Sequence, residues 1–353
     1  MHQNGLYPYV LDPKLTQQVW GGDELVRVYG KRGDPNAKLG ESWECWDTDR
    51  VLNGELSGST VADLRVRLAS ELLGNIDPSR IFPVLTKIIT AHDWLSVQVH
   101  PDDAYAQRVE HQPFGKTECW YVLDAQPNAQ IVYGWNRDTS RAEYERRVAD
   151  GTLGELLRYI ELKKGDTVYI PHGMVHAIGP GLTIFETQQA SDLTYRMFDY
   201  NRLGLDGKPR ELHVKKAADV LNYKATKGGT LAQIDYNFEG LDRTALIADQ
   251  HFVVERIVAT GEPATMETQA RPLIVMSLDV ALEVAIGESS VTLRPYQTTL
   301  VPAGCRWCTV RAAGGDRASF MFVTPPERNT ELPARLLAAG IAQDRIDGFM
   351  EQF

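Results

Sequence analysis

The sequence predicts a mainly β fold, a sandwich or barrel decorated by a few helices. Most of the chain consists of short runs rich in valine, isoleucine, threonine and aromatic residues, bounded by glycine, proline, asparagine and aspartate. This alternation is typical of many short strands joined by turns. Long helical patterns are few, and a weak internal repeat indicates that the chain holds two related β units.

The repeat links two segments that lie far apart in the chain. Residues 165–176 (GDTVYIPHGMVH) resemble residues 296–307 (YQTTLVPAGCRW), with the proline, the glycine and the last position in register. The first copy is longer by about the length of two capped helices. We therefore predict a first domain over residues 1–225, with a helical insert at about 140–159, and a second domain over residues 226–353.

The last position of the repeat predicts a difference between the two domains. Trp307 stands in the second copy where the first copy has His176. An indole offers an N–H donor but no lone pair for a cation. We therefore expect the second domain to be metal-free, with an aromatic side chain filling its interior.

Three stretches show helical patterns. A helix is predicted over residues 61–73, with Thr60 as its N-cap, because apolar residues recur on one face. The insert is predicted as two short helices, since Ser140 and Thr152 each open a capping-box pattern. A last helical pair is predicted over residues 332–352. Its apolar side chains should pack on the second domain of the same chain; they are Leu332, Leu336, Leu337, Ile346 and Phe349.

The composition excludes several classes of protein. The 353 residues include 37 Lys+Arg and 47 Asp+Glu, a net charge of −10, which argues against a nucleic-acid-binding protein. The most apolar stretch is interrupted by Asp279 and Glu283, and the N-terminus lacks the pattern of a secretory signal. Four cysteines do not make a disulfide framework. We expect a cytoplasmic protein, a monomer or weak homo-oligomer, with no membrane and no nucleic-acid partner.

Four polar residues on predicted strands and turns suggest a metal site. In a strand over residues 95–99, the period of two places Gln98 on the same face as the following His100. Glu118 begins the next strand, and His176 follows a tight turn. Alone, each residue could be a hydrogen-bonded core residue. Together they suit Zn²⁺, Mn²⁺, Fe²⁺ or Co²⁺, with one position left open for a substrate.

Several segments carry a resemblance to known families. The GxxxxxPxGxxH spacing of residues 165–176 resembles the second motif of the cupin superfamily. Over roughly residues 1–325 the chain closely resembles the type I phosphomannose isomerases, especially their short bacterial form. The segments that carry this resemblance are 95–103 (LSVQVHPDD), 115–118 (GKTE), 171–200, 20–22, 40–43 and 82–87. The resemblance implies two cupin-like jelly-roll barrels, a bicupin. It also implies a zinc-dependent enzyme that interconverts mannose 6-phosphate and fructose 6-phosphate.

The same resemblance implies roles for particular residues. The metal ligands would be Gln98, His100, Glu118 and His176. The catalytic arginine would be Arg196, and the other residues of the pocket would be Ser96, Lys87, Lys116, Glu186 and Asp192.

Isomerisation of an aldose to a ketose explains why these residue types are needed. A proton moves between C2 and C1 through a cis-enediol, so negative charge develops on O1 and O2. A metal polarises these oxygens, and Arg196 stabilises the charge without losing its own proton. Lys116 and Glu186 are both candidates for the base. Lys87 or Arg196 could hold the 6-phosphate.

Two departures from the family and three alternatives remain open. Gly115 occupies a place where longer members carry a histidine proposed as the base, and the tail over residues 326–353 is longer than the short form needs. The alternatives are a cupin isomerase or epimerase of another sugar phosphate such as glucose 6-phosphate, a non-catalytic sugar-phosphate sensor, and a metal-dependent oxygenase.

Overall fold

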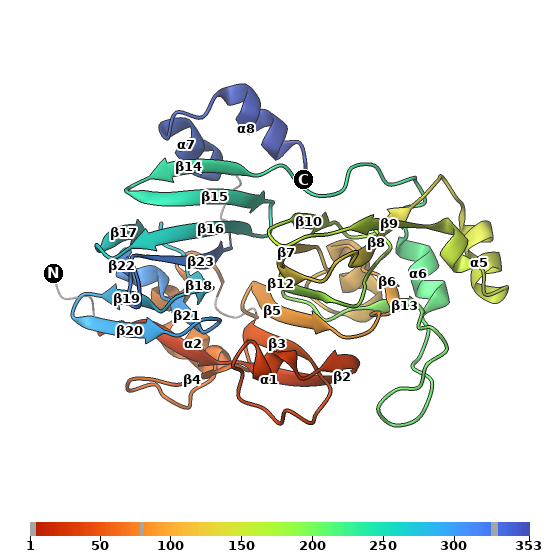
Figure 1. The fold of residues 1–353 in the computed structure, drawn as a ribbon, viewed down its shortest axis with the longest axis horizontal. Helices are drawn as coiled ribbons and strands as arrows, with labels where there is room; N and C mark the ends of the chain where they lie inside the picture. Colours follow the sequence, from red (N-terminus) through yellow and green to blue (C-terminus); the bar gives the residue numbers. More distant parts are fainter. Residues whose placement is uncertain (1–4, 78–80, 326–330) are drawn as a thin grey trace. The chain divides into compact units, whose positions relative to one another are not determined.

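Strands dominate the computed structural model of the chain, which describes residues 5–77, 81–325 and 331–353 (Figure 1). The prediction of a mainly β fold is therefore confirmed. None of the described helices combines the length and the apolar character needed to span a membrane.

Contacts divide the chain into two compact units that alternate along the sequence. Unit 1 holds the described residues of 1–14, 43–86 and 232–353, and unit 2 holds residues 15–42 and 87–231. The sequence analysis instead placed one boundary near residue 225. That division into two consecutive domains stays a prediction, and the two units are described separately below.

Two sheets carry most of unit 2. The first has the strand order β10-β7-β12-β5-β3-β2, and the second has the order β13-β6-β11-β8-β9. The strands of the first sheet are β2 (Lys14–Gly22), β3 (Leu39–Cys45), β5 (Val84–Ala91), β7 (Glu118–Ala125), β10 (Thr167–Ile170) and β12 (Leu182–Gln189). Those of the second are β6 (Val97–Val99), β8 (Gln130–Trp135), β9 (Leu157–Glu161), β11 (His176–Ile178) and β13 (Tyr195–Phe198).

The two sheets of unit 2 face each other across an apolar interior. Val122 and Ile184 from the first sheet and Ile131 from the second belong to one buried cluster. Val97 and Val99 instead belong to a second cluster, which packs the other face of the smaller sheet against helices α5 (Arg141–Ala149) and α6 (Val214–Val220). Successive residues of a strand point to opposite faces. The predicted split between Gln98 on one face and these two valines on the other is therefore confirmed.

The predicted helices are present, with local differences. Residues 61–73 form α2 (Val61–Leu68) and α3 (Ser70–Leu73), because the chain breaks at Ala69, where φ is 45°. Thr60 caps α2 in a capping box, as predicted.

The insert begins with α5, whose first turn is capped by the Ser140 hydroxyl, which accepts the N–H of Glu143 at 3.2 Å. The second part of the insert is only a 3₁₀ turn, η2 (Leu153–Leu156), and Thr152 makes no side-chain cap. The prediction of a second capping box was wrong.

Unit 1 also contains two sheets. Their strand orders are β14-β15-β16-β23-β18-β21-β1-β4 and β17-β22-β19-β20. The strands of the larger sheet are β1 (Tyr9–Asp12), β4 (Arg50–Val51), β14 (Ile234–Phe238), β15 (Leu241–Ala248), β16 (Val253–Thr260), β18 (Leu273–Ser277), β21 (Thr298–Val301) and β23 (Arg317–Thr324). Those of the smaller sheet are β17 (Ala264–Glu267), β19 (Leu282–Ile286), β20 (Ser289–Leu293) and β22 (Trp307–Ala312).

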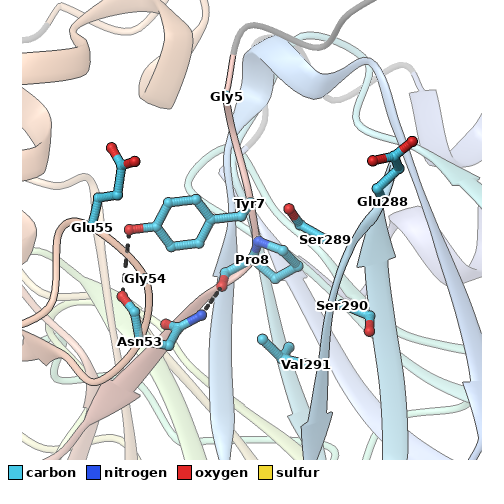
Figure 2. A pocket seen from close by; sticks show the side chains of 10 residues that line it. All are labelled: Gly5, Tyr7, Pro8, Asn53, Gly54, Glu55, Glu288, Ser289, Ser290 and Val291. Atoms are coloured by element: carbon cyan, nitrogen blue, oxygen red, sulfur yellow. Dashed lines mark hydrogen bonds between the residues drawn. The ribbon is translucent and has the colours of Figure 1, made fainter.

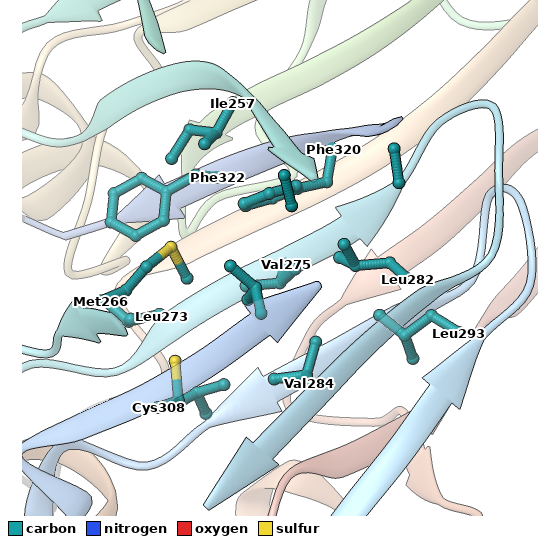
Figure 3. Close-up of a cluster of buried hydrophobic side chains, with 14 of the residues drawn as sticks. Ile257, Met266, Leu273, Val275, Leu282, Val284, Leu293, Cys308, Phe320 and Phe322 are labelled. Carbon is teal, nitrogen blue, oxygen red and sulfur yellow. The ribbon is translucent and has the colours of Figure 1, made fainter. Parts of the chain in front are cut away.

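Aliphatic and phenylalanine side chains fill the interior of unit 1 (Figure 3). Val275 and Phe320 come from the larger sheet and Val284 from the smaller one. Trp307 is 46% exposed, whereas its neighbour Cys308 points into the cluster. The prediction of an interior filled by an aromatic side chain at position 307 was therefore wrong. The sequence repeat had aligned Trp307 with an inward position, and a shift of one residue in a strand reverses the face.

The C-terminal tail forms two helices that cover part of unit 1. Helices α7 (Glu331–Ala338) and α8 (Gln343–Met350) lie beside β14 in Figure 1. The prediction that the tail packs on the same chain is confirmed for four side chains; these are Leu332, Leu336, Ile346 and Phe349. Leu337 is 56% exposed, so the prediction was wrong for this residue. Residues 326–330 of the predicted tail lie outside the described residues.

Adjacent leucines of α7 allow a direct test of this packing. Leu336 has no exposed surface, whereas Leu337 points to solvent. Leu336→Ala is expected to lower the free energy of unfolding by about 2–5 kcal/mol, because it leaves a cavity. Leu337→Ala should change it by less than about 0.5 kcal/mol. Denaturant unfolding of both variants checks this, and equal losses would show that α7 is not packed as described.

Candidate metal centre and active site

Three predicted ligands converge in the interior of unit 2. His100 follows β6, Glu118 is the first residue of β7, and His176 is the first residue of β11. Their ligand atoms lie within 4.8 Å of one another, and each residue is buried. Nε2 of His100 is 3.2 Å from Oε1 of Glu118, and Nε2 of His176 is 3.7 Å from Oε2. Two imidazoles and one carboxylate are a donor set that suits a divalent metal.

Backbone carbonyl groups orient both imidazole rings. Nδ1 of His100 donates to the carbonyl oxygen of Leu193 at 2.7 Å, and Nδ1 of His176 donates to that of Met174 at 2.9 Å. A carbonyl oxygen only accepts, so the proton of each neutral ring belongs on Nδ1. The Nε2 lone pairs are then directed to the cluster, which is the arrangement found at metal-binding histidines.

Burial and charge keep the three side chains in their metal-binding forms. Burial, with the nearby Lys116 ammonium, lowers the pKa of His100 to about 3. Burial also lowers the pKa of His176. Burial alone would raise the pKa of Glu118, but Lys116 and the histidine contacts hold it well below its ordinary value. Nε2 of His100 and Oε2 of Glu118 are buried without a hydrogen-bond partner. The residues therefore fit a bound cation.

Gln98 borders the cluster but presents its nitrogen to it. The residue is paired with His176 in the sheet, and its Nε2 lies 3.3 Å from Nε2 of His176. Its Oε1 accepts a hydrogen bond from the Ser96 hydroxyl at 3.2 Å. Only the amide oxygen can bind a metal, so a half-turn of the terminal amide is needed for Gln98 to act as a ligand.

Two lysines and two acidic residues lie next to the cluster. Nζ of Lys116 is 2.5 Å from Oε1 of Glu118. Nζ of Lys87 lies 3.4 Å from Oε2 of Glu186 and 3.8 Å from Oε2 of Glu41. Burial alone would lower the pKa of Lys87, but Glu41 and Glu186 raise it above its ordinary value. Lys87 is therefore a cation held between two carboxylates.

Trp120 connects Glu186 to the metal ligands. Its Nε1 donates to Oε1 of Glu186 at 3.0 Å, and its ring meets that of His176 edge-on, with centroids 5.6 Å apart. Burial and the charge of Glu118 raise the pKa of Glu186 to about 7, although Lys87 opposes this shift. Glu186 can therefore exchange a proton near neutral pH, as a general base must.

Within the described part of the chain, Arg196 and Asp192 make no hydrogen bond or ion pair with the three ligands. Arg196, on β13, is paired with Gln98 in the sheet. Its side chain therefore starts from the same face of the sheet as that of Gln98. Its Nη1 donates to the carbonyl oxygen of Glu211 at 2.9 Å, while its Nε is buried without a partner. Asp192 is exposed, in the segment between β12 and β13. Gln98 and Lys116 contact the cluster directly, and Ser96 contacts Gln98. Glu186 is joined to the cluster through Trp120, and Lys87 through Glu186.

Two further arginines lie near Arg196 and were missed from the sequence. Arg202 and Arg210 both donate to the buried carboxylate of Asp199, Arg202 from Nε at 3.0 Å and Arg210 from Nε at 2.7 Å. Burial and the charge of Arg210 lower the pKa of Arg196. Both arginines follow the motif that ends at Tyr200, so nothing in its spacing pointed to them. Glu41, which pairs with Lys87, lies inside the quoted 40–43 motif and could have been found.

Unit 1 contains a separate cleft of about 670 Å³ (Figure 2). The Tyr7 hydroxyl accepts the N–H of Leu56 at 2.8 Å, and the Asn53 amide donates to the carbonyl oxygen of Pro8 at 2.9 Å. These polar groups therefore bind the protein's own backbone. The described residues that line the cleft include no basic side chain; they are Gly5, Tyr7, Pro8, Asn53, Gly54, Glu55, Glu288, Ser289, Ser290 and Val291. The cleft does not suit a phosphorylated ligand.

The fold and the site define the class of protein. The chain is a mainly β protein with a buried ligand cluster of two histidines and one glutamate, adjoined by lysines and a carboxyl group that titrates near neutral pH. This combination is typical of metal-dependent enzymes that move protons on oxygen-rich substrates.

Comparisons with known proteins identify the family. Residues 9–128 match the family model of the phosphomannose isomerase type I catalytic domain. The chain is 37% identical over 300 residues to the mannose-6-phosphate isomerase of Streptococcus mutans, a match that covers 84% of this chain and 92% of that protein. It is 36% identical over 301 residues to mannose-6-phosphate isomerase ManA of Bacillus subtilis, covering 84% and 93%. The chain belongs to the type I mannose-6-phosphate isomerase family.

A solved structure agrees with this assignment. The crystal structure of the mannose 6-phosphate isomerase from Bacillus subtilis superposes with a TM-score of 0.81 at 30% sequence identity, over 90% of this chain and 99% of that one. The similarity therefore extends over both units and is not confined to the segment that carries the ligands.

Proposed function

We propose that the chain is a metal-dependent isomerase that interconverts mannose 6-phosphate and fructose 6-phosphate through a cis-enediol. The observation that carries this proposal is the buried cluster of His100, Glu118 and His176, with Lys116 in contact with it. The names of the relatives support the choice of sugar. The residues independently call for an anionic substrate rich in oxygen, since cations surround the cluster in a chain of net charge −10.

The proposed metal is one zinc ion per chain, held by His100, Glu118 and His176, with Gln98 as a further ligand through its amide oxygen. When bound, the metal polarises the two sugar oxygens between which charge moves. Three strong donors and one amide leave a coordination position for these oxygens. The neutral imidazoles and the ionised carboxylate described above support this assignment.

Residues of the chain stabilise the developing charge, transfer the proton and bind the substrate. Arg196 is proposed to stabilise the negative charge that develops on the enediol oxygens, because a guanidinium keeps its proton. The base that moves the proton between C2 and C1 is either Lys116 or Glu186. Lys116 pairs with a metal ligand, whereas Glu186, with its pKa raised to about 7, already exchanges protons near neutral pH. Ser96 would bind a sugar hydroxyl, and Asp192, which is exposed, would lie at the entrance.

The 6-phosphate needs basic side chains whose positive charge is not already neutralised by carboxylates. Lys87 is held between Glu41 and Glu186, so its charge is largely matched. Arg202 and Arg210 both donate to the buried carboxylate of Asp199, and Arg202 also pairs with the exposed Asp93 at 3.2 Å. We propose that Arg202 and Arg210 receive the 6-phosphate, which would displace the weakly held Asp93.

The pH dependence of the reaction tests the role of Glu186. If Glu186 is the base, it must be ionised to accept the proton, so kcat/KM should fall as the pH drops through about 7, the value to which burial raises the pKa of this group. Glu186→Gln should remove this limb together with most of the activity. If the limb persists in Glu186→Gln and exchange of the C2 proton with solvent is abolished by Lys116→Met, then Lys116 is the base.

A coupled assay tests the proposed function as a whole. Metal-replete protein is supplied with mannose 6-phosphate or glucose 6-phosphate, and the formation of fructose 6-phosphate is followed. Faster turnover of mannose 6-phosphate is expected. Faster turnover of glucose 6-phosphate would favour an isomerase of that sugar, and no turnover of either would favour a sensor.

We also propose a bicupin architecture, in which each unit is a cupin-like jelly roll and only unit 2 binds a metal. The support is that each unit pairs a larger and a smaller sheet around an apolar interior. The catalytic domain proposed for residues 1–225 contains all the residues of the site, and residues 226–353 form the proposed metal-free domain. The four cysteines are free and buried, which supports a reducing, cytoplasmic location. A monomer or weak homo-oligomer is proposed.

A further inference from the structure

Three chain segments meet beneath the proposed active site. They are residues 100–103, residues 115–118 and residues 188–193. The N–H of Lys116 donates to the carbonyl oxygen of Pro101 at 3.0 Å, which joins the first segment to the second. The first and second segments carry His100, Lys116 and Glu118, so whatever holds the three segments together also sets the distances between these groups.

The side chain of Gln189, which is buried, bridges these segments. Its Oε1 accepts the N–H of Thr117 at 2.9 Å, and its Nε2 donates to Oδ1 of Asp103 at 2.9 Å. Oδ1 of Asp103 also accepts the N–H of Gly115 at 2.7 Å. The orientation of the amide is fixed, because an N–H lies on one side and a carboxylate on the other. Gln189 and Asp103 therefore hold the backbone on both sides of Lys116.

Lys116 has no strand to position it. Strand β7 begins only at Glu118, so residues 115–117 precede its ladder. Space around them is tight: a Cβ atom on Gly115 would come within 2.4 Å of the Pro101 carbonyl oxygen. A displacement of about 1 Å in a reacting group is enough to lower the rate about 10²-fold. Two backbone hydrogen bonds hold this segment, from the N–H of Lys116 to Pro101 at 3.0 Å and from the N–H of Gln189 to Thr117 at 3.1 Å. The side chains of Gln189 and Asp103 add hydrogen bonds to the residues on either side of Lys116.

The same segment also holds a metal ligand. The carbonyl oxygen of Leu193 accepts Nδ1–H of His100 at 2.7 Å. The turn between Gln189 and Leu193 is closed by Gln188, whose Nε2 donates to the carbonyl oxygens of Gln189, at 3.1 Å, and of Ser191. One segment after β12 therefore contacts both the chain that carries Lys116 and the ring of His100.

We propose that Gln189 is a positioning residue that, together with Asp103, sets Lys116 relative to the metal ligands. The inference rests on the proposed function, in which Lys116 contacts the substrate and Glu118 binds the metal. Gln189 itself touches neither. Its contribution is to fix the backbone of the 115–118 segment through Thr117.

Exchanging the two partners provides a sharp test. Gln189→Glu removes the N–H donor and sets a carboxylate against that of Asp103, so the bridge breaks. Asp103→Asn keeps an oxygen that accepts from both Gly115 and Gln189, so this variant is the matched control. In the double variant the new amide at position 103 donates to the new carboxylate at position 189. The carboxylate still accepts from Thr117. In the wild type one atom, Oδ1 of Asp103, accepts from both Gly115 and Gln189, so the new amide must turn to direct its nitrogen to position 189 while its oxygen accepts from Gly115.

The measurements are kcat and KM for mannose 6-phosphate and the metal content of the wild type and the three variants. Loss of a group that orients an active-site residue typically costs about 10–100-fold in activity. We expect Gln189→Glu to lower kcat per bound metal by this factor with little change in KM, Asp103→Asn to stay near the wild type, and the double variant to recover most of the loss. Unchanged kcat per bound metal in Gln189→Glu, or a double variant no better than Gln189→Glu, would overturn the proposal.

Two controls keep the result interpretable. Thermal unfolding shows whether the charge introduced at position 189 prevents folding. If the Gln189→Glu variant does not fold, Asp103→Ala is tested instead, because Asp103 is only half-buried. A fall in kcat for Asp103→Ala supports the proposal, and an unchanged kcat overturns it. A wild-type chain that does not turn over mannose 6-phosphate contradicts the proposed function, whereas an active wild type with an equally active Gln189→Glu contradicts the positioning role.

Discussion

The double variant His100→Ala/His176→Ala is expected to lose both its metal and its activity. The two imidazoles supply two of the three donors that converge within 4.8 Å. Glu118 and the neutral amide of Gln98, which remain, cannot hold a divalent metal against water. A bound metal contributes several kcal/mol of charge stabilisation to reactions of this kind. A loss of that size corresponds to a fall in kcat on the order of 10³-fold or more.

Elemental analysis and the coupled assay measure the two effects separately. The wild type should hold one divalent metal per chain and lose it, with its activity, on treatment with a chelator. His172→Ala is the matched control, because His172 is exposed in the turn that precedes His176. Stoichiometric metal in the double variant would show that the ligands lie elsewhere.

The ligand cluster was predictable because its information is local. The period of two in a strand places Gln98 and His100 on one face, and Val97 and Val99 pack in the cluster on the other face. The turn before His176 returns that side chain to the same face. The directions of these side chains follow from their immediate neighbours in the sequence, so the structure matches the prediction for the ligand cluster.

Long-range pairing was harder to predict. Strand β1 pairs with β21, so residues near the N-terminus belong to the same sheet as residues near position 300. No local pattern in Tyr9–Asp12 encodes that partner. The misplacement of Trp307 has a related cause, since a repeat aligned by its proline and glycine does not fix which face a strand residue takes.

The supporting residues of the site were also invisible in the sequence. Gln189 acts through a hydrogen bond to the backbone of Thr117, 72 positions away. Arg202 and Arg210 reach Asp199 from a loop whose conformation has no periodic signature. Ligand types can be inferred from residue chemistry, whereas residues that orient the ligands need only a donor or an acceptor in the right place, which many residue types supply.

The substitution Arg196→Ala is expected to lower kcat more than it raises KM. Arg196 is paired with Gln98 in the sheet, so its side chain starts from the face that carries the metal ligands, and its Nε is buried without a partner. Negative charge develops on the enediol oxygens only as the reaction proceeds, so a donor aimed at them stabilises the transition state more than the bound substrate. Removing one such donor typically costs roughly 10²–10³-fold in rate.

Two further variants separate the possible roles of this arginine. Arg196→Lys keeps the charge but loses the planar guanidinium, so it should recover only part of kcat if two donors act on the enediol. Arg141→Ala removes an arginine of α5 that pairs with Asp219 at the exposed surface, and it should leave both constants unchanged. A rise in KM alone for Arg196→Ala would mean that Arg196 binds the phosphate equally in the substrate and in the transition state, and that the enediol charge is stabilised by another group.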